Sequence, residues 1–196
     1  HRVLTSEFVE GKTFVEARES SDEERRVWAT TLWRFVYRSL LVEGLFNADP
    51  HPGNYIFQPD GHVCFLDFGC IQPLGEERRL FTANLHRAAH EKDMDEFRKW
   101  GSLLLNTNGG SYEEMVFDYL SNCFKPITQS PFCISQDYAA SLVHQFKDMV
   151  MSLLKSKDDQ FVPMPPGILF INRLQFGFYS ILARLNVSVD YASNEL

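Results

Sequence analysis

The 196-residue sequence has no run of 18 apolar residues, no Cys-x-x-Cys pair and no zinc-type spacing of cysteine and histidine. A bilayer-spanning helix needs about 20 mostly apolar residues, so the sequence predicts no span. The cysteine pattern argues against a zinc site. We expect the four cysteines to be buried structural thiols in a reducing compartment, because free cysteine is a strongly buried residue type. A disulfide between Cys123 and Cys133 is the alternative.

Basic residues are also scarce relative to acidic ones. The chain has 19 Lys and Arg against 26 Asp and Glu, for a formal net charge of -7. A nucleic-acid surface needs a basic stripe, so we expect no nucleic-acid partner. The acidic balance is also a poor match for anionic lipid, although local patches could still bind it.

Hydrophobic residues, by contrast, are plentiful. They make up 44% of the chain and include 17 Phe and 3 Trp, which favours one packed lobe over disorder. Residues 3–9 read as a strand, and Ser21 with Glu24 forms a capping box at the start of a long buried helix. Apolar periodicity and end signals predict helices over the following ranges: 21–44, 75–91, 94–104, 112–123, 135–154 and 166–185.

Two polar motifs flank a predicted β-hairpin. The first is Asn47-Ala48-Asp49-Pro50-His51-Pro52-Gly53-Asn54, whose Pro and Gly residues exclude a helix interior. Strands expected at 55–57 and 62–66, joined by a turn at 59–61, lead to the second motif, Phe65-Leu66-Asp67-Phe68-Gly69. The hairpin therefore brings both motifs to one cleft.

The cleft contains the residue types that phosphoryl transfer from a nucleotide needs. One carboxylate orients the acceptor hydroxyl, while an Asn and a second Asp hold magnesium on the phosphates. We therefore predict Asp49 as the catalytic residue, and Asn54 and Asp67 as Mg2+ ligands for bound ATP. The alternatives are that Asp49 only caps the loop and that Asn54 makes an Asx turn.

Two further loop residues are candidates for binding the nucleotide. His51 either contacts phosphate or the acceptor, or only braces the loop between its two prolines. Gly53 is expected to supply backbone freedom where the loop turns toward the metal.

The run Ala48 to Asn54, followed by Phe65-Leu66-Asp67-Phe68-Gly69, resembles the AarF/UbiB family of atypical kinases. The segment Leu4 to Gly11 is similar to the hinge between that family's two lobes. The resemblance covers residues 1–105 firmly and the later helices loosely. It implies an α+β, mainly α-helical fold: a protein-kinase-like C-lobe with a small catalytic β-hairpin.

The hinge resemblance implies two more nucleotide contacts. The carbonyl of Glu7 and the amide of Val9 would face the adenine, and a plain edge strand is the alternative. Asn47 departs from the family pattern, because many relatives have His two residues before the catalytic Asp. Asn can still make loop hydrogen bonds, so we do not interpret the change as inactivating.

The resemblance also implies a missing amino-terminal kinase lobe. That lobe would carry an ion-paired Lys, a loop over the phosphates and a Lys-x-Gly-Gln motif, and this sequence contains none of them, nor Gly-x-Gly-x-x-Gly. We expect residues 1–12 to be a hinge strand and linker, and residues 13–196 the helical lobe. Activity would need the other lobe, because a nucleotide held from one side is poorly oriented.

The acceptor is expected to be small. The sequence enters a predicted helix at residue 75 and lacks the Ala-Pro-Glu that ends the peptide-docking segment of protein kinases. The resemblance implies an atypical kinase or ATPase of ubiquinone and prenyl-lipid metabolism. Its partners would be a lipid or quinone precursor and a membrane surface, at the cytoplasmic face of a bacterial membrane or in a mitochondrion or plastid. The alternatives are a small-molecule kinase of the aminoglycoside or choline type and a non-catalytic nucleotide-binding module.

Overall fold

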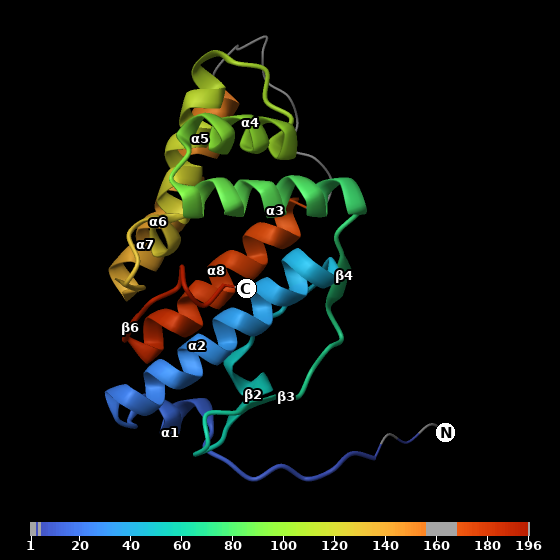
Figure 1. Ribbon diagram of the computed structural model, residues 1–196, viewed down its shortest axis with the longest axis vertical. Helices are drawn as coiled ribbons and strands as arrows, with labels where there is room; N and C mark the ends of the chain where they lie inside the picture. Colours follow the sequence, from blue (N-terminus) through green and yellow to red (C-terminus); the bar gives the residue numbers. More distant parts are fainter. Residues whose placement is uncertain (1–2, 4, 156–167, 196) are drawn as a thin grey trace.

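The computed structural model describes residues 3, 5–155 and 168–195. Helices dominate the described residues, and the strands form small two-stranded sheets, which confirms the expected α+β, mainly α-helical fold (Figure 1). The helices are α1 (Phe14–Arg18), α2 (Asp22–Arg38), α3 (Glu76–Glu91), α4 (Met94–Leu105), α5 (Gly110–Cys123), α6 (Lys125–Thr128), α7 (Gln136–Lys155) and α8 (Ile168–Leu185). The strands are β1 (Leu45–Asn47), β2 (Tyr55–Phe57), β3 (Val63–Phe65), β4 (Ile71–Pro73), β5 (Phe132–Cys133) and β6 (Ser188–Val189).

Helix α2 is the centre of the core, as its broad apolar stripe predicts. Ser21 caps it through the expected capping box, in which the Glu24 amide donates to Ser21 Oγ and the Ser21 amide donates to Glu24 Oε2. Trp28 and Trp33 are at most 1% exposed, and such buried aromatic side chains stabilise the fold by about 1.5–3 kcal/mol each. The helix continues as a π-helical turn, η1 (Ser39–Glu43), and ends at Gly44 with a φ of 66°.

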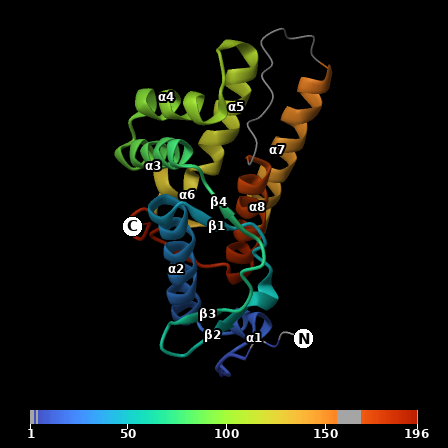
Figure 2. The same ribbon diagram turned by 90° about the vertical axis from the view of Figure 1, so that its right-hand side faces the viewer.

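Helix α8 lies beside α2, and α7 packs against α8 on another side (Figure 2). Helices α3, α4 and α5 stack above this pair (Figure 1). The described part of the predicted last helix, 168–185, is confirmed, whereas Pro166 lies outside the described residues. Among the residues that the structure describes, no helix is long and apolar enough to cross a membrane.

The predicted hairpin is present. Strand β2 pairs antiparallel with β3, with Tyr55 opposite Phe65 and Phe57 opposite Val63. The turn uses Gly61 at a φ of 88°, which explains the glycine there. Phe65 stacks on Phe35 of α2 at 3.8 Å between ring centroids, so the hairpin is held against the central helix.

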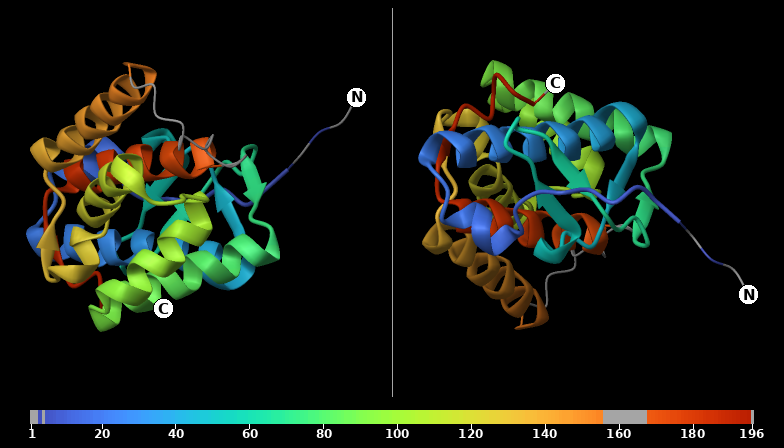
Figure 3. Two further views of the ribbon diagram at one scale, coloured as in Figure 1. Left: turned by 90° about the horizontal axis from the view of Figure 1, so that it is seen from above. Right: turned by 90° about the horizontal axis from the view of Figure 1, so that it is seen from below.

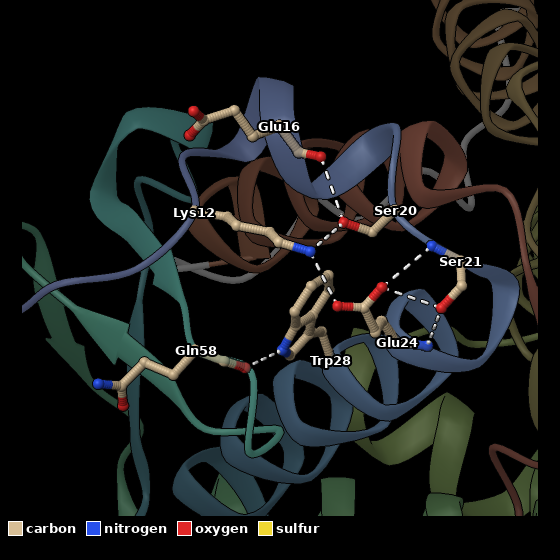
Figure 4. A network of polar contacts seen from close by, with 7 residues as sticks. All are labelled: Lys12, Glu16, Ser20, Ser21, Glu24, Trp28 and Gln58. Carbon is tan, nitrogen blue, oxygen red and sulfur yellow. Dashed lines mark hydrogen bonds and ion pairs between the residues drawn. The ribbon is translucent and has the colours of Figure 1, made fainter.

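A polar network fixes the other side of the hairpin (Figure 4). Lys12 Nζ donates to Glu24 Oε1 at 2.8 Å, and Trp28 Nε1 donates to the Gln58 carbonyl at 2.8 Å. The backbones of Lys12 and Phe57 also exchange two hydrogen bonds. The chain before α1 therefore crosses the hairpin and ties it to α2 (Figure 3, right).

The strand expected at residues 3–9 is wrong for the described residues. Residues 5–10 are mostly exposed and join no sheet, because no described strand pairs with them. The sequence analysis also missed α1, α6 and the strand pairs β1–β4 and β5–β6. The division at residue 12 into hinge and lobe stays a prediction.

The cysteine predictions are only partly right. Cys123 is buried, but Cys64 and Cys70 are half-buried and Cys133 is exposed. All four are free thiols, so the alternative disulfide between Cys123 and Cys133 does not form in this structure.

Candidate active site

The two polar motifs lie side by side, because the β2–β3 hairpin and the β1–β4 strand pair flank them on either side. Strand β1 precedes the loop of Asp49 and pairs antiparallel with β4, which follows Asp67. Beyond the strands, the Ala48 amide donates to the Cys70 carbonyl at 3.0 Å. The Leu66 amide donates to the Asn54 carbonyl at 2.9 Å. These bonds bring Asn54 next to the residue that precedes Asp67.

The Asn47 side chain ties the two motifs together. Its Nδ2 donates to the Asp67 carbonyl at 2.8 Å, and its Oδ1 accepts the Asp49 amide at 3.1 Å. One side chain thus fixes the backbone at Asp49 and at Asp67. Asn47 thus makes the kind of loop hydrogen bond that we expected of it, but its role in linking the two motifs was not predicted.

Asp67 and Asn54 are the predicted ligands of the metal. Asp67 Oδ1 accepts the Gly69 amide at 2.7 Å, which orients the exposed carboxylate. Asn54 is half-buried, and its side chain makes no hydrogen bond to any described residue. Carboxylate and amide oxygens are the ligands that Mg2+ prefers, and Mg2+ typically takes one or two carboxylates plus phosphate oxygens. The residues therefore fit the predicted ion.

No group of three or more His, Cys, Asp or Glu side chains that could hold a metal occurs in the described ranges. A site of one Asp and one Asn would depend on the nucleotide phosphates to complete the coordination of Mg2+.

His51 is oriented by the loop itself. Its Nδ1 accepts the Gly53 amide at 3.1 Å, which caps the short 3₁₀ turn η2 (Pro52–Asn54). This contact favours the bracing interpretation of His51, although the ring remains exposed. Gly53 does not have a positive φ, contrary to the expected backbone freedom; a Cβ there would lie 3.1 Å from His51 Nδ1. Close approach to the imidazole explains this glycine.

Glu7 and Val9 are the least defined candidates. Glu7 is exposed and Val9 half-buried, and neither forms a hydrogen bond with another described residue. Near them, Gln58 Nε2 donates to the Glu10 carbonyl at 3.4 Å. Their contact with adenine stays a prediction.

Helix α8 supplies a residue that the sequence analysis did not assign to the site. Arg173 Nη2 donates to Asp49 Oδ1 at 3.0 Å. On the same helix, a Cβ at Gly177 would lie 2.6 Å from Pro50 Cγ, so the helix is in close contact with the loop. The available signal was an Arg in the middle of a mostly apolar helical segment.

Asp49 also influences a buried neighbour. The pKa of Tyr55 is raised well above its usual value, first by burial and second by the negative charge of Asp49. Tyr55 therefore stays a neutral phenol beneath the loop.

The helical lobe, with its two strand pairs next to the motifs of Asp49 and Asp67, has a kinase-like fold. Residues 1–100 match the family described as the ABC1 atypical kinase-like domain. The chain belongs to this family, and the expected AarF relationship is confirmed by relatives that carry that name.

Curated relatives come from plants and animals. The Arabidopsis thaliana protein ACTIVITY OF BC1 COMPLEX KINASE 3, chloroplastic, is 44% identical over 81 residues, which cover 40% of this chain and 11% of that protein. The Mus musculus AarF domain-containing protein kinase 1 is 31% identical over 113 residues, or 53% of this chain and 21% of that protein. The matches thus span only a small part of each relative.

A solved structure supports the fold. The Mycobacterium tuberculosis protein Rv3197, determined in complex with erythromycin, is similar with a TM-score of 0.63 and 22% identity. The match covers 95% of this chain and 46% of that one. At this identity, the similarity shows a shared kinase-like fold and nothing about ligands.

Proposed function

We propose that this chain is the carboxy-terminal lobe of an ATP-dependent atypical kinase or ATPase. The observation that carries the proposal is the Asn47 link, which holds the backbones of Asp49 and Asp67 through one side chain. Phosphoryl transfer depends mainly on positioning and on stabilising charge, so two carboxylates fixed relative to each other are its minimum requirement.

The reaction assigns one task to each residue. Asp49 orients the acceptor oxygen and takes its proton, while Asn54 and Asp67 hold the magnesium that neutralises phosphate charge when bound. Glu7, Val9, His51 and Gly53 are the proposed contacts to the nucleotide. An amino-terminal lobe with the usual lysine would cover the nucleotide from the other side.

We further propose a small or lipid-like acceptor, or water. The chain after Gly69 forms β4 and enters α3 at Glu76, which leaves no long peptide-docking segment there and supports this choice. Relatives occur in chloroplasts and in the cyanobacterium Synechocystis, which agrees with a plastid or bacterial location. The proposed process is ubiquinone or other prenyl-lipid metabolism at a membrane surface.

The test is substitution of Asp67 in the complete gene product. Asp67→Asn should reduce magnesium-dependent phosphate release from ATP by more than about 100-fold, because a formal charge is lost from the metal site. Asp60→Asn is the matched control: Asp60 lies in the exposed hairpin turn and pairs with His62. Turnover of Asp67→Asn within about tenfold of wild type, roughly 1.4 kcal/mol of barrier, would contradict the assignment.

A further inference from the structure

The ion pair between Arg173 and Asp49 has little value for folding. The two side chains are 58% and 45% exposed. Ion pairs in water-accessible positions contribute about 0–1 kcal/mol, and salt screens them. Stability therefore does not account for this ion pair. Its position at the proposed catalytic carboxylate points to a role in the reaction.

Helix α8 presents Arg173 to the loop in a fixed position. Arg173 and Gly177 are four residues apart, so they lie on the same helix face. The missing side chain at Gly177 lets the helix approach Pro50, which neighbours Asp49. Buried Phe178 and Leu174 pack the adjacent face of α8 into the core. The packing of α8 thus fixes the backbone that carries the Arg173 side chain beside the loop.

The catalytic loop contains no strong cation of its own. Pro50, His51, Pro52 and Gly53 separate Asp49 from Asn54. The only titratable ring among them, His51, uses Nδ1 to accept the Gly53 amide. Transfer of a phosphoryl group spreads negative charge over its equatorial oxygens, and cations placed there stabilise the transition state.

We propose that Arg173 is a catalytic residue that contacts the transferred phosphoryl group while it holds Asp49. This inference rests on the proposed function. The guanidinium has five donors in a planar fork, and Asp49 Oδ1 takes one of them. Because the side chain is more than half exposed, the remaining donors can reach phosphoryl oxygens beside Asp49.

The acceptor oxygen, from water or a small hydroxyl compound, forms the new bond to the γ-phosphorus. The bond from that phosphorus to the bridging oxygen breaks, and its electron pair leaves with ADP. The acceptor proton passes to the Asp49 carboxylate, and Arg173 stabilises the charge on the three equatorial oxygens.

The first experiment measures turnover and nucleotide affinity separately in the complete gene product. Arg173→Gln should lower kcat at least about 100-fold, because a charged donor at the transition state is lost, while Kd for magnesium-ATP changes less than about threefold. Arg173→Lys should recover at least about tenfold of the loss, since it restores the charge without the fork. Arg184→Gln, in the last turn of the same helix, is the control and should leave both values unchanged.

The second experiment separates direct contact from action through Asp49. In an Asp49→Asn background, single-turnover rates with excess enzyme should fall at least about fivefold further when Arg173→Gln is added. No further loss would show that Arg173 only positions Asp49, and would overturn the proposal. A kcat for Arg173→Gln within twofold of wild type would also overturn it. If Asp67→Asn kept wild-type turnover, the proposed function itself would fail, which is a separate result.

Discussion

Replacing Asn47 tests how the structure assembles its two motifs. Asn47→Ala removes the donor to the Asp67 carbonyl and the acceptor of the Asp49 amide in one step. Each hydrogen bond contributes about 0.5–1.5 kcal/mol, so unfolding should become easier by about 1–3 kcal/mol. The value should fall in the lower half of this range, because water can replace both partners at this half-buried position.

The effect on activity should be larger than the effect on stability. Without Asn47, the described segments around Asp49 and Asp67 are still joined by the β1–β4 and β2–β3 pairs and by the hydrogen bonds Ala48 to Cys70 and Leu66 to Asn54, but no hydrogen bond links Asp49 and Asp67 through one side chain. A displacement of about 1 Å in a catalytic group costs about 100-fold in rate. We therefore expect kcat for ATP turnover to fall about 30–300-fold, with chemical unfolding and phosphate release measured on the same preparations.

Asn47→Asp is the informative partner variant. It keeps the acceptor for the Asp49 amide but replaces the donor by a carboxylate facing the Asp67 carbonyl. Its rate should be as low as that of Asn47→Ala or lower. If both variants unfold more easily yet turn over ATP at the wild-type rate, the link is structural only, and the positioning argument is wrong.

Two further predictions concern packing and pH. Gly177→Ala should destabilise the protein by about 1–3 kcal/mol and lower ATP turnover, because the new Cβ would lie 2.6 Å from Pro50 Cγ and the proline ring cannot move aside. An unchanged melting temperature and an unchanged turnover rate would refute the close packing of α8 on the loop. Glu195 is buried, and burial alone would raise the pKa of its carboxyl. Its contacts with His86 and His90 outweigh burial and lower that pKa to about 2. The hydrogen bond to Glu195 in turn raises the pKa of His90. Through its lowered pKa, Glu195 contributes to the free energy of unfolding above its unfolded-state pKa of about 4.3. Through its raised pKa, His90 contributes below its unfolded-state pKa of about 6.5, and this contribution is lost as pH rises through the raised value. Chemical unfolding of wild type and Glu195→Gln should therefore differ most near pH 5–6 and less above pH 8; a difference that grows at alkaline pH would contradict this assignment.

Elements with complete local signals were predictable from the sequence. Helix α2 carries its own start signal at Ser21 and its own end at Gly44, and the β2–β3 hairpin contains its turn at Gly61. Helix α1 has an equally local signal, since Thr13 and Glu16 form a capping box, so this helix is also predictable from the sequence. The strand expected at residues 3–9 failed for another reason: extended sequence becomes a strand only where a partner strand pairs with it.

The parts of the site that the sequence could not predict are contacts between residues far apart in the chain. Strands β1 and β4 are three residues each, too short to show a periodicity, and their pairing depends on the fold. Asn47 is visible in the sequence as a departure from the family pattern, but its two hydrogen-bond partners come together only when the β1–β4 and β2–β3 pairs have formed.

Arg173 is also a contact between residues far apart in the chain. A motif identifies Asp49, Asn54 and Asp67 because their spacing is set within one continuous segment. The cation beside Asp49 comes instead from α8, 124 positions away in sequence, and a glycine on that helix permits the approach. The carboxylates of this site are therefore encoded locally, whereas the charge that faces Asp49 depends on correct packing of the last long helix. Loss of α8 packing should remove the proposed activity before it separates the strands, because β1–β4 and β2–β3 are each held by their own backbone pairs.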